Sequence, residues 1–90
     1  MQLCTVARVW ADGEKWYVLL NLPPLGSSVS EQMAALLGDT PHSIRCTVRS
    51  NNQFVVELHP GAAESSEQAH DRGEALCVYA TTLIATNYLK

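Results

Sequence analysis

An Asp-Gly pair at positions 12 and 13 separates two segments, 3–11 and 14–22, that are rich in β-branched, aromatic and aliphatic side chains. Asp-Gly is typical of the two-residue β-hairpin loop of type I′, in which both central residues need a positive φ. A loop of this length also fixes the strand register, so it predicts Ala11 opposite Glu14 and Trp10 opposite Lys15. The chain is therefore expected to begin with a tight antiparallel hairpin.

This register gives the hairpin two faces of different character. The first is an ordinary apolar core face, formed by Leu3, Thr5, Ala7, Val9, Trp16, Val18, Leu20 and Leu22. The second combines aliphatic, aromatic and basic side chains, and consists of Cys4, Val6, Arg8, Trp10, Lys15, Tyr17, Leu19 and Asn21. The second face is therefore not the polar surface that a half-buried sheet usually presents to water.

Turn and cap signals predict a helix after the first hairpin. Pro23-Pro24 ends the second strand, because proline cannot donate a ladder hydrogen bond. Ser28 and Glu31 have the spacing of a capping box, and an apolar stripe follows them. We expect a short amphipathic helix over 29–37.

A second hairpin and a second helix follow. Segments 43–49 and 53–58 alternate between apolar and polar residues, and a three-residue loop at 50–52 puts Arg45 opposite Glu57. Segment 60–74 is small and acidic, and two interpretations stay open for it: a loop, or a frayed helix start capped by Ser65 and Gln68. The strong helical pattern begins near Gly73 and continues to Leu89.

The element order ββαββα predicts an α+β fold, a two-layer sandwich with a four-stranded, mainly antiparallel sheet and two helices on one face. We expect residues 1–90 to form a single domain, because 90 residues are too few for two cores. The final helix is apolar on more than one side, which favours burial against a second copy of the chain.

Composition narrows the class of protein. The sequence has 47% hydrophobic and 17% charged residues, which excludes a disordered chain. The uncharged segment 75–89 is shorter than the roughly 18 residues of a membrane-spanning helix, and residues 1–9 lack a basic signal-peptide region. Three cysteines at wide spacings predict free thiols in a reducing compartment. We expect a cytoplasmic protein with no membrane association.

One pattern points towards catalysis. Cys77 lies early in the last predicted helix, with His59 and His70 upstream, so a thiolate with an imidazole base is conceivable. A cysteine-dependent hydrolase using Cys77 with His59 or His70 is therefore an alternative function. The simpler interpretation is a buried, inert thiol on a core helix, because free cysteine is among the most buried residue types.

The segment 69–83, AHDRGEALCVYATTL, resembles the active-site region of the Prp family of ribosomal-processing cysteine proteases. In that family a Gly-His-Ala turn precedes a helix that bears the cysteine, so the resemblance implies a thiol protease. Here the turn reads Leu-His-Pro at 58–60, and the acid before Cys77 is Glu74, at a different offset. We therefore assign no catalytic residue from this resemblance.

Neither a metal nor a cofactor is expected. His42 and Cys46 are the one near pair of metal-ligating residues, and their spacing on a strand matches no known zinc pattern. The five glycines are scattered, so no phosphate-binding loop is present.

The second hairpin face carries the functional prediction. Four of the six basic residues occupy outward positions of the predicted strands, beside aromatic side chains. Because Trp, Tyr and Arg dominate interface hot spots, we expect a small non-enzymatic interaction module that binds a protein partner and forms a homodimer. Inhibitors and adaptors, including phage-encoded anti-defence proteins, are the expected functional type. The predicted contact residues are Val6, Arg8, Trp10, Lys15, Tyr17, Leu19, Arg45 and Arg49.

Two other interpretations apply to the same face. Basic and aromatic side chains on an open sheet also bind single-stranded nucleic acid, although the formal charge of −3 disfavours it. Alternatively, the last helix covers this face within the monomer, which would leave no docking surface.

Overall fold

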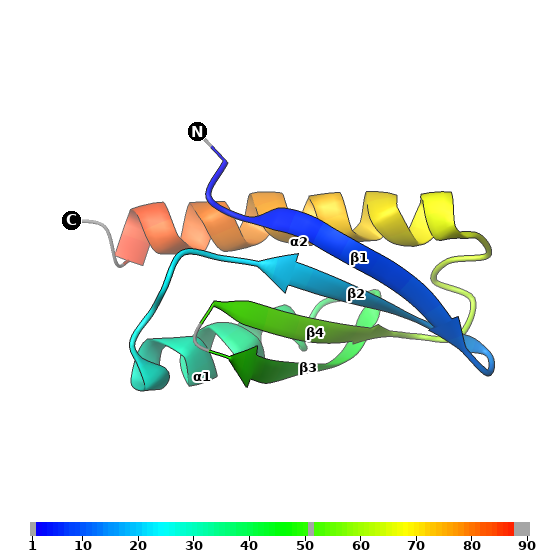
Figure 1. Ribbon diagram of the computed structural model, residues 1–90, viewed down its shortest axis with the longest axis horizontal. Coiled ribbons are helices and arrows are strands. Elements are labelled where there is room, and N and C mark those ends of the chain that lie inside the picture. Colours follow the sequence, from blue (N-terminus) through cyan, green and yellow to red (C-terminus); the bar gives the residue numbers. More distant parts are fainter. Residues whose placement is uncertain (1, 51, 88–90) are drawn as a thin grey trace.

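The computed structural model describes residues 2–50 and 52–87 and shows the element order ββαββα (Figure 1). The four strands form one antiparallel sheet in the order β1-β2-β4-β3. The elements are β1 (Thr5–Asp12), β2 (Lys15–Asn21), α1 (Ser27–Leu37), β3 (Ser43–Ser50), β4 (Gln53–Leu58) and α2 (Ser66–Asn87).

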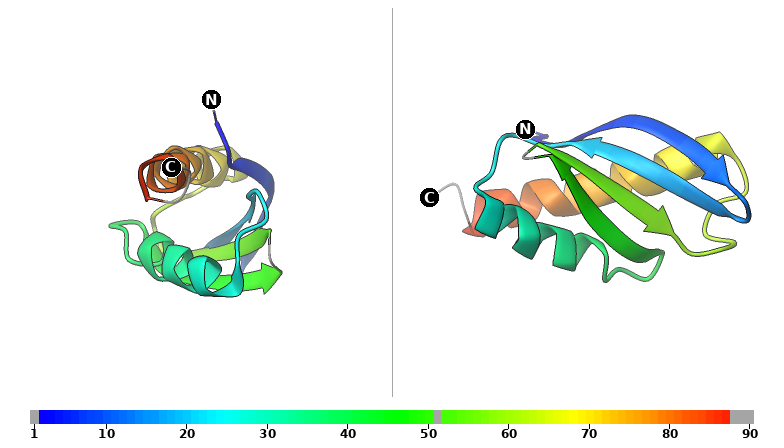
Figure 2. Two further views of the ribbon diagram at one scale, coloured as in Figure 1. Left: turned by 90° about the vertical axis from the view of Figure 1, so that its left-hand side faces the viewer. Right: turned by 60° about the horizontal axis from the view of Figure 1, so that its bottom comes forward.

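Both helices lie on the same side of the sheet, and the opposite side is uncovered (Figure 2). Helix α2 packs against β1 and β2, while α1 packs against β3. This arrangement confirms the predicted α+β class with two helices on one sheet face. Within the described ranges, neither helix is long and apolar enough to cross a bilayer.

The core fills the space between the sheet and the helix layer. Val18 and Leu20 of β2 and the inward residues of β4 are fully buried, while Trp16 of β2 is partly buried. Apolar residues from one stripe of each helix complete the core. Its largest fully buried side chains are Val18, Leu20, Met33, Leu37, Phe54, Val56, Leu58 and Ile84.

The first hairpin differs from the predicted register. Asp12 pairs with Lys15 and Trp10 with Tyr17, so the loop residues are Gly13 and Glu14. Gly13 has φ +68°, and no described residue other than glycine has a positive φ. A turn with positive φ at its first central position only is of type II′. The predicted pairing of Trp10 with Lys15 is therefore wrong by two residues on the second strand.

A β-bulge at Ala7 changes the first half of β1. Arg8 pairs with Leu19, whereas Val6 pairs with Leu20, so Ala7 is an extra residue in this strand. The bulge turns Cys4 and Val6 towards α2, where Cys4 is fully buried and Val6 packs against the core. The prediction that Val6 lies on the outward face is therefore wrong, because alternation does not continue through a bulge.

The second hairpin is closer to its prediction. Arg45 faces Glu57, and Val48 faces Phe54, as predicted. The predicted three-residue loop at 50–52 is wrong, however, because Ser50 is the last residue of β3 and pairs with Gln53. Register shifts beside Ile44 and Arg49 make the two ends of β3 irregular. Residue 51 of the predicted loop lies outside the described residues.

Helix α1 begins without its predicted capping box. It starts at Ser27 after an N-cap glycine, Gly26, and it has no side-chain cap. The Ser28–Glu31 prediction is therefore wrong: Ser28 is already inside the helix.

Helix α2 begins at Ser66, whereas the strong helical pattern in the sequence begins only near Gly73. The Gln68 amide donates to Ser65 Oγ (3.2 Å), and the Gln68 side-chain oxygen accepts from the Glu64 amide (2.8 Å). This cap bears out the helical interpretation of the segment from Ser66 onwards, while 60–65 form the loop. The predicted continuation to Leu89 lies outside the described residues.

Gly73 sets how closely α2 approaches the sheet. A Cβ atom at this position would lie 2.7 Å from Val18 Cγ1 and 2.8 Å from Val6 Cγ2. Only a residue without a side chain fits here, which brings the helix backbone against the first hairpin.

Candidate functional site

The sheet surface opposite the helices is the larger candidate site, and we call it the open face. Its side chains form two rows across all four strands. One row consists of Trp10, Tyr17, Glu57 and Arg45, and the next consists of Arg8, Leu19, Val55 and Thr47, with Lys15 beside them. The interpretation in which α2 covers this face is wrong, because α2 packs on the core side of β1 and β2.

Three side chains form a stack at the β1–β2 side of the open face. The rings of Trp10 and Tyr17 are parallel within 9°, and their centroids are 5.6 Å apart. The Arg8 guanidinium carbon lies 5.1 Å from the centroid of the Trp10 ring, in cation–π geometry. Cross-strand pairing of Trp10 with Tyr17 holds the rings side by side, so the stack is built into the sheet register.

An ion pair links β2 to β4 next to this stack. Lys15 Nζ donates to Glu57 Oε2 at 2.8 Å. The hydrogen bond from Lys15 holds the pKa of the Glu57 carboxyl below its ordinary value, and the positive charge of Arg45 acts in the same direction. The same hydrogen bond raises the pKa of Lys15. Lys15, one of the predicted contact residues, is therefore already paired with a carboxylate of the same chain.

The remaining predicted contact residues are not all on one patch. Leu19 does lie on the open face, but it is only 7% exposed and forms its floor. Arg49 is exposed at the irregular end of β3, on the sheet edge opposite to β1. Val6 faces α2, as described above. The structure thus groups Arg8, Trp10 and Tyr17 tightly, with Arg45 in the same row.

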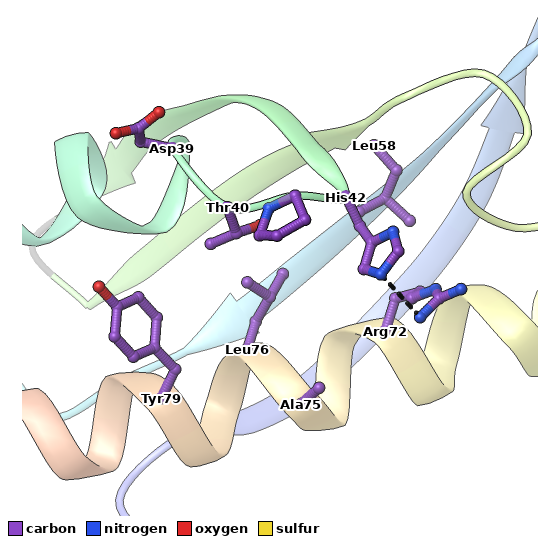
Figure 3. A pocket seen from close by; sticks show the side chains of 9 residues that line it. Asp39, Thr40, His42, Leu58, Arg72, Ala75, Leu76 and Tyr79 are labelled. Carbon is purple, nitrogen blue, oxygen red and sulfur yellow. Dashed lines mark hydrogen bonds between the residues drawn. The ribbon is translucent and has the colours of Figure 1, made fainter.

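A cavity of about 370 Å³ is the second candidate site, and it lies on the helix side of the molecule (Figure 3). Loop 39–42 forms one wall and α2 the other, with Leu58 and Leu76 among the apolar lining residues. At its rim, Arg72 Nη1 lies 3.1 Å from His42 Nε2, and Arg72 Nε donates to the Ala62 carbonyl at 2.9 Å.

This volume is within the range of small-molecule sites, which runs from about 300 to 1,000 Å³. The guanidinium of Arg72, however, already joins α2 to two loops, so its first role is structural. Sequence reasoning missed this cavity because its walls come from segments that are far apart in the chain. No local motif joins them.

The hydrolase hypothesis needs a histidine beside the Cys77 thiol, and the structure places neither His59 nor His70 in contact with it. Cys77 is fully buried, and its Sγ lies 2.8 Å from the Sγ of Cys4. His59 and His70 are exposed, and His70 Nε2 lies 3.7 Å from the Glu74 carboxylate. In the described part of the chain, the one hydrogen-bond contact of Cys77 Sγ is with Cys4.

Among residues 2–50 and 52–87, no group of three or more His, Cys, Asp and Glu side chains is placed to hold a metal ion. Comparison with protein-family models, with curated proteins and with solved structures gives no match for this chain. The open face therefore has to be interpreted from its own geometry and charge.

Proposed function

We propose that this protein is a small interaction module of the inhibitor or adaptor type, which binds a protein partner through its open face and carries out no catalysis of its own. The observation that supports this proposal is the Arg8–Trp10–Tyr17 stack on the sheet surface opposite to α1 and α2. Arg, Trp and Tyr are the residue types enriched at binding hot spots.

The stack also has the rigidity that favours binding. Each ring is half-buried and packed against the other, so little side-chain freedom is left to lose when a partner docks. Leu19, in the adjacent row, is only 7% exposed and gives the face an apolar floor. A preorganised aromatic pair over an apolar floor suits a flat or shallowly curved partner.

Charge indicates the chemistry of that partner. Arg8 and Arg45 are exposed on the open face, whereas Lys15 and Glu57 largely neutralise each other. The acidic residues of α2, by contrast, belong to the helix layer on the other side of the sheet. We therefore expect an acidic protein surface as the partner, since complementary charge guides association and suppresses wrong partners.

A second copy of the chain fits the open face less well. Two open faces in contact would bring arginines of like charge together, which is unfavourable. Apolar residues exposed on the helix side, Leu36, Val78 and Tyr79, offer a different surface for the expected self-association. The mass of the protein in solution distinguishes these arrangements.

Binding experiments with matched variants test the proposal. The immobilised protein is used to isolate a partner, which is then purified and titrated against the wild type and two open-face variants, Trp10→Ala and Arg8→Glu. We expect each variant to lower the affinity at least about tenfold, as hot-spot substitutions do. Ala35→Ser, a change at an exposed position of α1 on the helix side, is the control and should leave the affinity within about twofold.

Three outcomes would contradict the proposal. Equal affinity of the wild type and both open-face variants would show that binding occurs elsewhere. Bound material that is sensitive to nuclease, with affinity falling steeply as salt is added, would instead support single-stranded nucleic-acid binding. A dimer mass that becomes a monomer mass in Trp10→Ala would identify a second copy as the occupant of the open face.

A further inference from the structure

The two buried thiols of Cys4 and Cys77 meet between the start of the chain and α2. Their Sγ atoms are 2.8 Å apart, although 73 positions separate them in the sequence. Both side chains are fully buried, and both cysteines are free thiols. A disulfide bond needs an Sγ separation of about 2.05 Å, so only a small further approach is required.

Two features of the fold bring these sulfur atoms together. The bulge at Ala7 turns Cys4 from the open face to the core side. Gly73 lies one helical turn before Cys77, on the same side of α2, and allows the helix backbone to approach Val6 closely. The contact between the thiols therefore results from specific backbone features.

We propose that Cys4 and Cys77 are a disulfide-forming pair, which a small-molecule disulfide of the glutathione type oxidises to a bond that ties the chain ahead of β1 to α2. In the first step one protein thiolate attacks a sulfur of oxidised glutathione, which forms a mixed disulfide and releases one glutathione thiolate. The second protein thiolate then attacks the protein sulfur of that mixed disulfide. The protein loses two thiol protons and two electrons, and two molecules of reduced glutathione are formed.

Access for the oxidant requires the segment ahead of β1 to separate from α2. Residues before β1 are held to α2 by two hydrogen bonds, Leu3 N–H to Thr81 Oγ1 (3.0 Å) and Gln2 Nε2 to Glu74 Oε2 (3.4 Å). Segments outside the regular strands open at a lower free-energy cost than core strands. In the closed state, the hydrogen bond to Cys77 and burial both raise the pKa of Cys4. Because the thiolate is the attacking species, oxidation should accelerate as the pH rises from 7 to 9.

The third cysteine is a natural control for this pair. Cys46 lies on β3 and is half-buried, and burial raises its pKa to about 12. In the described part of the chain, the Cys46 thiol forms no hydrogen bond with another sulfur atom. It should remain reduced while the other two react.

Peptide mapping after oxidation tests the proposal on the full chain. Dilute reduced protein is incubated with oxidised glutathione, quenched with acid, alkylated and cleaved with trypsin. Cleavage after Arg8, Arg45, Arg49 and Arg72 places the three cysteines on separate peptides, 1–8, 46–49 and 73–90. We expect the intact mass to fall by two hydrogen atoms, the thiol count to fall from three to one, and peptide 1–8 to be linked to 73–90.

Matched variants complete the test. Cys46→Ser should form the same link as the wild type, and Cys77→Ser should form none. The proposal is overturned if all three thiols persist, if only separate glutathione adducts form, or if the link involves 46–49 or joins two chains. Because Cys46→Ser carries the decisive measurement, the test does not depend on Cys77→Ser remaining folded.

Discussion

The indole ring of Trp10 and the phenol ring of Tyr17 stack in parallel across the first hairpin, with 5.6 Å between their centroids. They face each other because the hairpin turns at Gly13 and Glu14, one position later than the Asp-Gly signal predicts. A turn at Asp12 and Gly13 would have placed Lys15 beside the indole and moved Tyr17 beside Arg8. The aromatic stack of the open face therefore depends on the exact position of one two-residue loop.

A double-mutant cycle should measure this stack. We expect Trp10→Ala and Tyr17→Ala each to lower the free energy of unfolding, with a coupling energy of about 0.5–1.5 kcal/mol, because ring stacking adds to the apolar area that each residue buries. Urea denaturation of the four proteins gives this value. Tyr17→Phe keeps the ring and should retain most of the coupling. A coupling energy near zero would mean that the rings do not interact in solution.

The bulge at Ala7 predicts opposite effects for neighbouring substitutions. Val6 packs against the core, whereas Ala7 is exposed. Val6→Ser should therefore cost about 1–3 kcal/mol of unfolding free energy, and Ala7→Ser should stay within about 0.5 kcal/mol of the wild type. Thermal or urea unfolding of the two variants decides between the registers. An uninterrupted strand would reverse the order of the two effects.

Gly73→Ala should destabilise the protein although alanine is the better helix former. The added Cβ would lie 2.7 Å from Val18 Cγ1 and 2.8 Å from Val6 Cγ2. We expect a loss of about 1–3 kcal/mol from overpacking, which exceeds the gain of about 1 kcal/mol in helix propensity.

Two comparisons check this explanation by urea denaturation. Gly26→Ala adds a Cβ atom with no neighbour within 4 Å, so it should cause no overpacking and should lose only the modest preference of an N-cap for glycine over alanine. Val6→Ala in the Gly73→Ala background removes the clash and should recover part of the lost stability. A Gly73→Ala variant that is more stable than the wild type would show that α2 is not held close to the hairpin.

The Lys15–Glu57 pair should contribute to stability over a defined pH window. The pKa of Glu57 is lowered from 4.5 in the folded state, so its contribution is present above the unfolded value and is lost as the pH falls through the folded pKa. The pKa of Lys15 is raised from 10.5, so its contribution is complete below that value and is lost as the pH rises through the folded pKa.

Urea unfolding of the wild type and Glu57→Gln at several pH values measures this contribution. The stability difference should be small, as for exposed ion pairs, and should be greatest between these two limits and smaller in high salt. In a Lys15→Met background the effect of Glu57→Gln should lose most of this pH dependence. A difference that stays constant down to pH 2 would show that the carboxylate is not stabilised by its charge.

Local signals in the sequence determined the element order and much of the pairing. Alternation within 45–48 and 54–57 places Arg45 opposite Glu57, because strand neighbours joined by a short loop have few possible registers. The capping residues Ser65 and Gln68 likewise mark the start of α2 by interactions within one helical turn. The α+β class follows from these local elements and their order.

Tertiary contacts decided what the alternation rule could not. Whether β1 contains a bulge depends on the packing of Val6 and Cys4 against α2, and that helix is more than 60 positions away in the sequence. The Lys15–Glu57 pair depends on β2 lying beside β4, which no turn signal specifies. One extra residue in a strand reverses which face every residue beyond it points to. The bulge itself costs free energy, and this cost is offset only by contacts that form once the helix has packed against the sheet.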